Sequence, residues 1–218
     1  MSTSIFVPGL RLYDNPQASS PRRVRIFLAE KGVEVERVLI DTSGRENYGE
    51  AFTRLNPFRV VPVLELPDGR TIAESQAIVR YFEARFPEPP LLGRDAFEVA
   101  TIEAWTRRIE HEVYLQIVAI RRHTDPAYAG RSIAGVQAGF AQVPAIAEHA
   151  QAVLVRTLGQ LATRLEGHAF VAGDRFSNAD ILLLVALDLA ARARLALALP
   201  ATIERWLVEL RRRPSAEA

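Results

Sequence analysis

The chain has 218 residues, of which 49% are hydrophobic, and its 27 Lys and Arg residues nearly balance its 26 Asp and Glu residues. This is enough apolar material for one large core or two smaller ones, and the balanced charge argues against nucleic acid or an anionic membrane surface as a partner. The absence of cysteine excludes disulfides, thiolate metal sites and any mechanism in which a protein thiol attacks the substrate.

The sequence carries no signal for export or membrane insertion. Its N-terminus has no positively charged segment followed by an apolar core, so we expect a cytoplasmic protein without a secretory signal. Charged residues, among them Asp188 and Arg192, interrupt the most apolar run, 181–199, and a bilayer span would have to bury them. No zinc-protease spacing and no phosphate-binding glycine loop occurs, so we also expect no metal site.

The first half of the chain alternates strand-like and helical segments. We predict a strand at 11–14, a helix at 21–31 with Pro21 in its first turn, and a strand at 34–40. An irregular region with one short helix follows, through Phe52. Strands at 63–66 and 70–73 form a hairpin around Asp68-Gly69, and a further helix starts at Glu74.

Val61-Pro62 marks the turn that enters the strand at 63–66. Proline cannot donate to a sheet ladder, so Pro62 fits the first residue of a strand better than its interior. A cis bond here would leave the N–H and C=O of Val61 pointing outward. A peptide-like ligand could bind these two groups as an added strand.

Glu74-Ser75 stands at the start of the helix that follows the hairpin. The backbone N–H groups and positive dipole end of this helix suit a carboxylate, with the Ser75 hydroxyl assisting and Glu74 available for an ammonium group. Ser75 alone is equally consistent with an ordinary helix start. Its spacing from Val61-Pro62 is what favours a ligand site.

The second half of the chain is helical throughout. Apolar periodicity predicts long helices at 96–123, 143–166, 178–199 and 202–212. Ser177 and Asp180 are spaced as an N-cap and its reciprocal partner, which we interpret as a folding element. The proline-rich run 86–90 predicts a stiff, extended linker between the two halves.

Three stretches resemble the cytosolic glutathione transferases, and the resemblance extends over essentially the whole chain: RRVRIFLAEKG at 22–32, NPFRVVPVL at 56–64 and FVAGDRFSNAD at 170–180. It implies an α+β fold with an N-terminal thioredoxin-like domain at 1–86, a linker at 87–94 and an all-α helical domain at 95–218. Within the family the chain is most similar to a bacterial group related to fungal transferases that lack the usual N-terminal catalytic side chain.

The resemblance implies glutathione as co-substrate and a cis bond before Pro62. It assigns glutathione binding to Val61, Pro62, Glu74 and Ser75. Asn47 matches a position where relatives hold the glycyl end of glutathione, and Arg59 matches a basic residue of some classes. Asn47 and Arg59 are equally consistent with ordinary loop side chains.

Activation of the thiol is assigned to the loop before the first helix. The commonest catalytic serine position of the family falls on Ala18, which leaves Ser19 and Ser20 as the catalytic candidates, unless both only cap the helix ahead of Pro21. The fungal relatives use a Ser and a His of the second domain instead. Those positions fall near Val118 and Arg122-His123, so His123 is the alternative.

The same resemblance implies a pocket for a hydrophobic electrophile between the 18–21 loop and the first helix of the second domain. Its expected lining is His111, Leu115, Val118, Arg122 and His123, although such a stripe also fits an interdomain core. A homodimer is implied as well. Two other functions stay open, a glutathione-dependent isomerase or peroxidase and a non-enzymatic glutathione-binding or interaction module.

Overall fold

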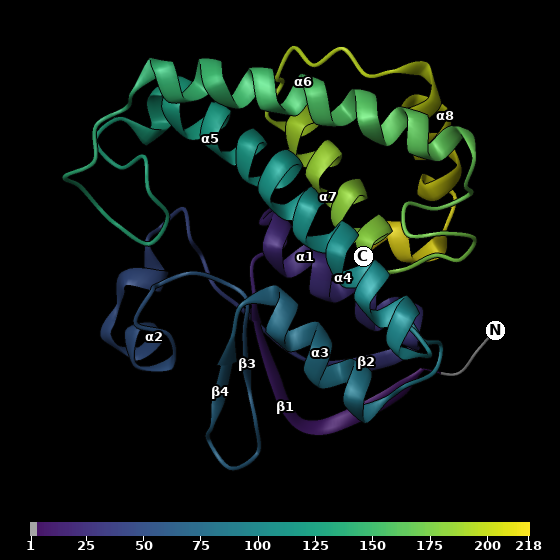
Figure 1. Ribbon diagram of the computed structural model, residues 1–218. Coiled ribbons are helices and arrows are strands. Elements are labelled where there is room, and N and C mark those ends of the chain that lie inside the picture. Colours follow the sequence, from purple (N-terminus) through teal and green to yellow (C-terminus); the bar gives the residue numbers. More distant parts are fainter. Residues whose placement is uncertain (1–3) are drawn as a thin grey trace. The chain divides into compact units, whose positions relative to one another are not determined.

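The computed structural model describes residues 4–218, and the chain forms two compact units (Figure 1). The first comprises the residues through Pro89 together with Glu217–Ala218, and the second comprises Pro90–Ala216. The division falls within the proline-rich run. The last two residues group with the first unit, which the sequence did not predict.

The first unit is built on a four-stranded sheet in the order β2-β1-β3-β4. Strands β1 (Ile5–Asp14) and β2 (Val33–Leu39) are parallel, whereas β3 (Val63–Glu65) runs antiparallel to β1 and to β4 (Thr71–Ala73). Strand β1 starts six residues before the predicted 11–14. A register shift between Phe6 and Arg11, at Gly9 with φ 79°, interrupts the alternation that the prediction used.

Three α-helices complete this unit: α1 (Ser19–Lys31), α2 (Glu50–Leu55) and α3 (Ser75–Arg85). A short 3₁₀ helix, Glu46–Tyr48, precedes α2. Helices α1 and α3 pack against each other, and Figure 1 shows α2 apart from this pair. Side chains that are 0% exposed fill the core, and each stabilises the fold by about 1.5–3 kcal/mol: Leu12, Phe27, Leu64, Ile78 and Phe82.

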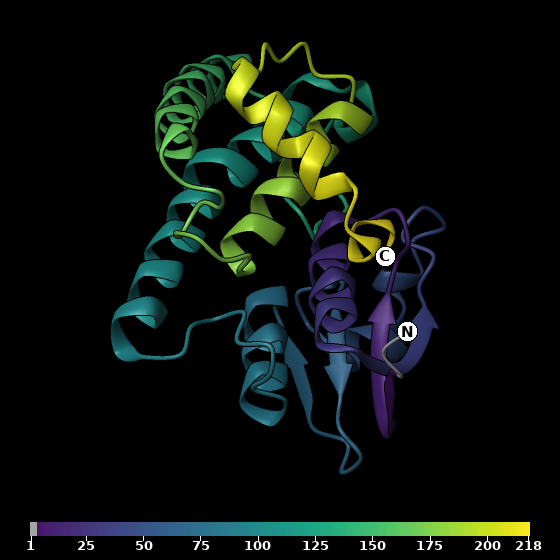
Figure 2. The same ribbon diagram turned by 90° about the vertical axis from the view of Figure 1, so that its right-hand side faces the viewer.

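The second unit is all helical. Its main helices are α4 (Ala96–Ile109), α5 (Leu115–Thr124), α6 (Pro144–Glu166), α7 (Asn178–Arg192) and α8 (Ala201–Arg211). Short 3₁₀ segments occur at Pro126–Tyr128 and Pro214–Glu217. Helix α7 is buried along nearly its whole length and runs through the middle of the bundle (Figures 1 and 2), which explains why its sequence is the most apolar of the chain.

Two helix predictions in this unit were wrong in extent. The predicted helix 96–123 is interrupted by a π turn at Glu110–Tyr114, which separates α4 from α5. The predicted helix 178–199 ends at Arg192. Arg194 adopts φ 54°, and the N–H of Leu195 donates to the carbonyl of Ala190, so a left-handed C-cap ends α7. Glycine usually occupies this position, and its absence left no sequence signal for the helix end.

The capping box at the start of α7 is confirmed. The Asp180 carboxylate, 0% exposed, accepts hydrogen bonds from the Ser177 N–H at 2.9 Å, the Ser177 hydroxyl at 2.8 Å and the Val171 N–H at 2.8 Å. Burial nevertheless raises the pKa of Asp180 to about 6, because the loss of hydration outweighs these three donors.

Candidate functional site

The Val61 turn has the backbone that a strand-like ligand requires. The bond between Val61 and Pro62 is cis, as predicted. In the part of the chain that the structure describes, neither the N–H nor the C=O of Val61 forms a hydrogen bond. These two groups form an open edge ahead of β3.

The start of α3 lies next to this turn because of the hairpin register. Val63 pairs with Ala73, so extending the register by two residues sets Val61 opposite Ser75. Glu74 is exposed and adopts φ 71° and ψ 121°, a sparsely populated conformation of the kind found at ligand sites. No side chain caps α3, so its first N–H groups face the turn without a competing cap.

Ser75 is 4% exposed, and its hydroxyl oxygen accepts a hydrogen bond from Nη1 of Arg23, on α1, at 3.3 Å. A guanidinium group can only donate, so the hydroxyl hydrogen of Ser75 is left for another acceptor. An anionic group at the start of α3 would be such an acceptor. The structure therefore brings a third segment, α1, to this edge.

The predicted catalytic serines lie at the beginning of α1. Tyr13 pairs with Val63, so the end of β1 and the loop after it lie at the same edge of the sheet as the Val61 turn. Ser19 is 9% exposed and Ser20 is half-buried, whereas Ala18 occupies the N-cap position with no side-chain cap. Their catalytic role stays a prediction.

A buried ion cluster that the sequence reasoning missed holds this loop. The Asp14 carboxylate is 0% exposed and contacts Nη1 of Arg25 at 2.7 Å and Nη2 of Arg37 at 2.6 Å. Arg25 also donates to the carbonyl of Pro16 at 3.2 Å. Burial lowers the pKa of Arg25, and the nearby Asp14 opposes that shift.

Asn47 and Arg59, both predicted to contact glutathione, are brought together. Nδ2 of Asn47 donates to the carbonyl of Arg59 at 2.7 Å, and Arg59 adopts φ 57°. Among the described residues, Oδ1 of Asn47 and Nε of Arg59 are buried with no hydrogen-bond partner. An unsatisfied acceptor and an unsatisfied donor are left for a polar ligand.

The residues expected to line an electrophile pocket lie around the π turn of the second unit. His111 is exposed within that turn, Leu115 is exposed just after it, and Val118 is half-buried. A π turn holds one residue more than an α-helical turn. Leu115 and Val118 therefore share a helix face, but His111 does not continue that face as an unbroken α-helix would.

Two further predicted residues have structural partners. The guanidinium of Arg122 lies 4.8 Å from the ring centre of Tyr128, and its Nη1 donates to the carbonyl of Arg131 at 3.3 Å. Nδ1 of His123 accepts from the N–H of Val143 at 3.0 Å. Both side chains thus hold the segment between α5 and α6, and their substrate contacts stay a prediction.

Glu112 organises the π turn, and the sequence reasoning missed it. Its carboxylate accepts from Arg108 at 3.1 Å, from Arg156 at 2.8 Å and from the Thr157 hydroxyl at 2.8 Å. Two of these partners lie on α6, more than forty residues along the chain. Of these partners, only Arg108 lies close enough in the sequence, four residues before Glu112, for the contact to be visible there.

Across residues 4–218, no helix is long and apolar enough to cross a membrane. The same residues contain no group of three His, Asp or Glu side chains close enough to hold a metal ion.

Comparisons with known proteins agree on one family. The model of the glutathione S-transferase N-terminal domain matches residues 19–85, and that of the C-terminal domain matches residues 135–214. Glutathione S-transferase 2 of Saccharomyces cerevisiae is 31% identical over 207 residues, which cover 94% of this chain and 86% of that protein.

Two solved structures are similar over nearly the whole chain. The crystal structure of Gtt2 from Saccharomyces cerevisiae has a TM-score of 0.85 at 30% identity, covering 95% of this chain and 98% of that one. A Gtt2-class glutathione S-transferase of Vibrio parahaemolyticus has a TM-score of 0.78 at 31% identity, covering 94% of each chain.

A thioredoxin-like unit with an open cis-proline turn, followed by a helical unit, defines the glutathione transferase fold. The chain belongs to the cytosolic glutathione S-transferase family and is a glutathione S-transferase homologous to Gtt2 over most of its length. The predicted family, fold class and enzyme class are confirmed. Membership implies glutathione and an electrophile as substrates.

Proposed function

We propose that the predicted domain 1–86 binds glutathione along the edge formed by the Val61 turn and the start of α3. The observation that carries this is the pairing of an open Val61 backbone with an uncapped helix start at Ser75. Val61 would hold the cysteinyl backbone as an added strand. Ser75 and the α3 N–H groups would hold the γ-glutamyl carboxylate, and Glu74 would hold its ammonium group.

Asn47 and Arg59 would bind the glycyl end. The free Oδ1 of Asn47 can accept from an amide, and Nε of Arg59 can donate to a carboxylate. Pro62 shapes the turn and contributes no hydrogen bond of its own.

The reactive thiol is supplied by glutathione, because the chain has no cysteine. A thiol of pKa about 8.5 is about 3% ionised at pH 7, and lowering its pKa by two units requires about 2.7 kcal/mol of preferential stabilisation of the charged form. A hydroxyl hydrogen bond from Ser19 or Ser20, added to the dipole of α1, is of that size. The ionised sulfur then attacks a hydrophobic electrophile.

Calorimetry on a Ser75→Ala variant tests the binding proposal. Removing a hydrogen bond to a charged carboxylate costs about 1–3 kcal/mol, so glutathione should bind about 5- to 150-fold more weakly. Ser43→Ala is the matched control, because Ser43 is an exposed serine of the same unit with no role in the site. Equal affinity in the two variants would remove Ser75 from the site.

The remaining assignments rest on family membership alone. We propose a cytoplasmic homodimer whose electrophile site includes His111, Leu115, Val118, Arg122 and His123. Light scattering at working concentration should give twice the chain mass, and a monomeric mass would overturn the dimer. Leu115→Ala should raise KM for the electrophile without changing the affinity for glutathione.

A further inference from the structure

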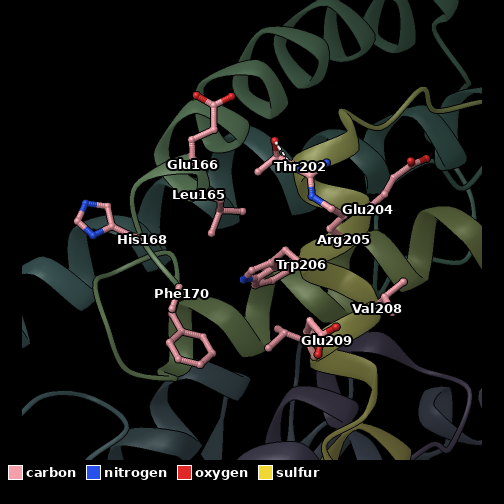
Figure 3. A pocket seen from close by; sticks show the side chains of 12 residues that line it. Leu165, Glu166, His168, Phe170, Thr202, Glu204, Arg205, Trp206, Val208 and Glu209 are labelled. Atoms are coloured by element: carbon pink, nitrogen blue, oxygen red, sulfur yellow. Dashed lines mark hydrogen bonds between the residues drawn. The ribbon is translucent and has the colours of Figure 1, made fainter.

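A cavity of about 850 Å³ lies wholly within the second unit, between the end of α6, the segment that follows it and α8 (Figure 3). None of the residues predicted for glutathione or the electrophile lines it. Its volume lies within the range of about 300–1,000 Å³ found for small-molecule sites.

The floor and walls of the cavity are mainly apolar and aromatic. They include Leu165, Phe170, Trp206 and Leu210. Trp206 is 7% exposed, and its Nε1 has no hydrogen-bond acceptor among residues 4–218. Figure 3 shows this nitrogen directed toward the space bordered by His168 and Phe170. A buried indole N–H ordinarily finds a partner, so a ligand with an acceptor atom would satisfy it.

The rim of the cavity carries more negative than positive charge. Three glutamates line it, Glu166, Glu204 and Glu209, whereas Arg205 is the one Lys or Arg residue of its described lining. Glu209 is paired with Arg212 at 2.9 Å. In the described chain neither Glu166 nor Glu204 forms an ion pair. An aromatic wall next to an unpaired carboxylate favours a cation and disfavours an anion.

His168 also borders this rim. Its Nε2 lies 2.5 Å from Nη1 of Arg164, and its Nδ1 lies 3.8 Å from Oδ1 of Asp174. Glutathione and its conjugates carry a net negative charge at neutral pH, so they do not match this cavity.

We propose that this cavity is a second ligand site of the protein, specific for protonated alkylamines that also carry an aromatic ring system. The ring system would pack against Trp206, Phe170 and Leu165. The ammonium group would face Glu204 and Glu166, and an acceptor atom of the ligand would take the Trp206 N–H. The proposal is independent of the glutathione site, which belongs to the first unit.

Quinine is a suitable probe, since it combines an aromatic ring system, a protonated amine and acceptor atoms. Calorimetry on the full chain should show one quinine bound per chain, with unchanged affinity in saturating S-hexylglutathione. The anionic dye 8-anilinonaphthalene-1-sulfonate should not compete with quinine. Competition by either compound, or no saturable binding of quinine, would overturn the proposal.

Three variants locate the binding. Trp206→Phe keeps a ring but removes the N–H, and should weaken quinine binding about fivefold to tenfold. Glu204→Gln should weaken it about threefold without touching the core. Glu148→Gln changes an exposed glutamate of α6 outside the cavity and should bind quinine as the natural chain does. Unchanged affinity in both Trp206→Phe and Glu204→Gln would place any binding elsewhere and refute the assignment.

Discussion

Replacing Asp14 by Asn tests how the loop before α1 is held. The substitution keeps the shape of the side chain but leaves Arg25, whose side chain is 8% exposed, without a counter-charge in the core of the first unit. Arg37 is 44% exposed and can turn to water, so the cost comes mainly from Arg25. Breaking a buried pair on one side costs about 3–5 kcal/mol.

Hydrogen exchange followed by mass spectrometry is the appropriate assay. Both tryptophans, Trp105 and Trp206, belong to the second unit, so tryptophan fluorescence does not report on the first. Peptides covering β1 and α1 should lose about 3–5 kcal/mol of opening free energy in Asp14→Asn. Because Arg25 also holds the carbonyl of Pro16, glutathione binding should weaken in the same variant.

Two controls separate this effect from a general loss of charge. Asp68→Asn removes an exposed partner of Arg70 and should leave exchange unchanged. Adding Arg25→Gln to Asp14→Asn should restore part of the lost stability, because no unpaired charge is then left inside. Exchange in Asp14→Asn within about 1 kcal/mol of the natural chain would refute the reasoning.

Three further outcomes follow from the structure. Asp180 has its pKa raised from 3.8 to about 6, so the native chain holds a proton that the unfolded chain releases. Its contribution to unfolding free energy should therefore fall by up to about 3 kcal/mol as pH rises from about 4 to 6, and urea titrations of Asp180→Asn should lack that fall. Gly93 has φ 110°, and an added Cβ would lie 2.5 Å from the Val99 nitrogen, so Gly93→Ala should lower the urea midpoint of unfolding. Gly159 lies in the middle of α6 with no atom of another described segment within 4 Å of an added Cβ, so Gly159→Ala should raise that midpoint. Ser19→Ala or Ser20→Ala, whichever removes the activating hydroxyl, should raise the thiol pKa of bound glutathione by about one unit with little change in glutathione affinity. If the thiol pKa shifts in neither variant, the α1 dipole is left as the activator.

The parts that the sequence predicted are those specified by near neighbours. Val61-Pro62, the hairpin around Asp68-Gly69 and the Ser177 to Asp180 box each depend on residues within about ten positions, and their turn or capping chemistry is explicit. The two hairpin strands and the starts of α3 and α7 followed from these signals. The open Val61 backbone depends on the cis bond before Pro62, which the family resemblance implied, because X–Pro bonds are mostly trans and the local sequence does not specify the isomer.

The parts that were missed depend on distant partners. The π turn at Glu110–Tyr114 is held by Glu112 through residues of α6, and no local periodicity shows such a contact. Asp14 likewise depends on Arg25, which appeared in the sequence only within the basic stretch 22–25, and on Arg37, which appeared only as a residue of the predicted strand 34–40. The end of α7 was missed because Arg194, rather than glycine, takes the left-handed conformation.

The proposal that this domain binds glutathione and ionises its thiol is tested most directly by titrating the bound thiol. Thiolate absorbance of glutathione, measured against pH with the enzyme in excess, should give a pKa about two units below the value of about 8.5 for a free thiol. The same titration in Ser43→Ala should be unchanged, whereas in Ser75→Ala it should require more enzyme to saturate. A bound thiol that titrates at the free value, in a protein that binds glutathione, would contradict the proposed activation.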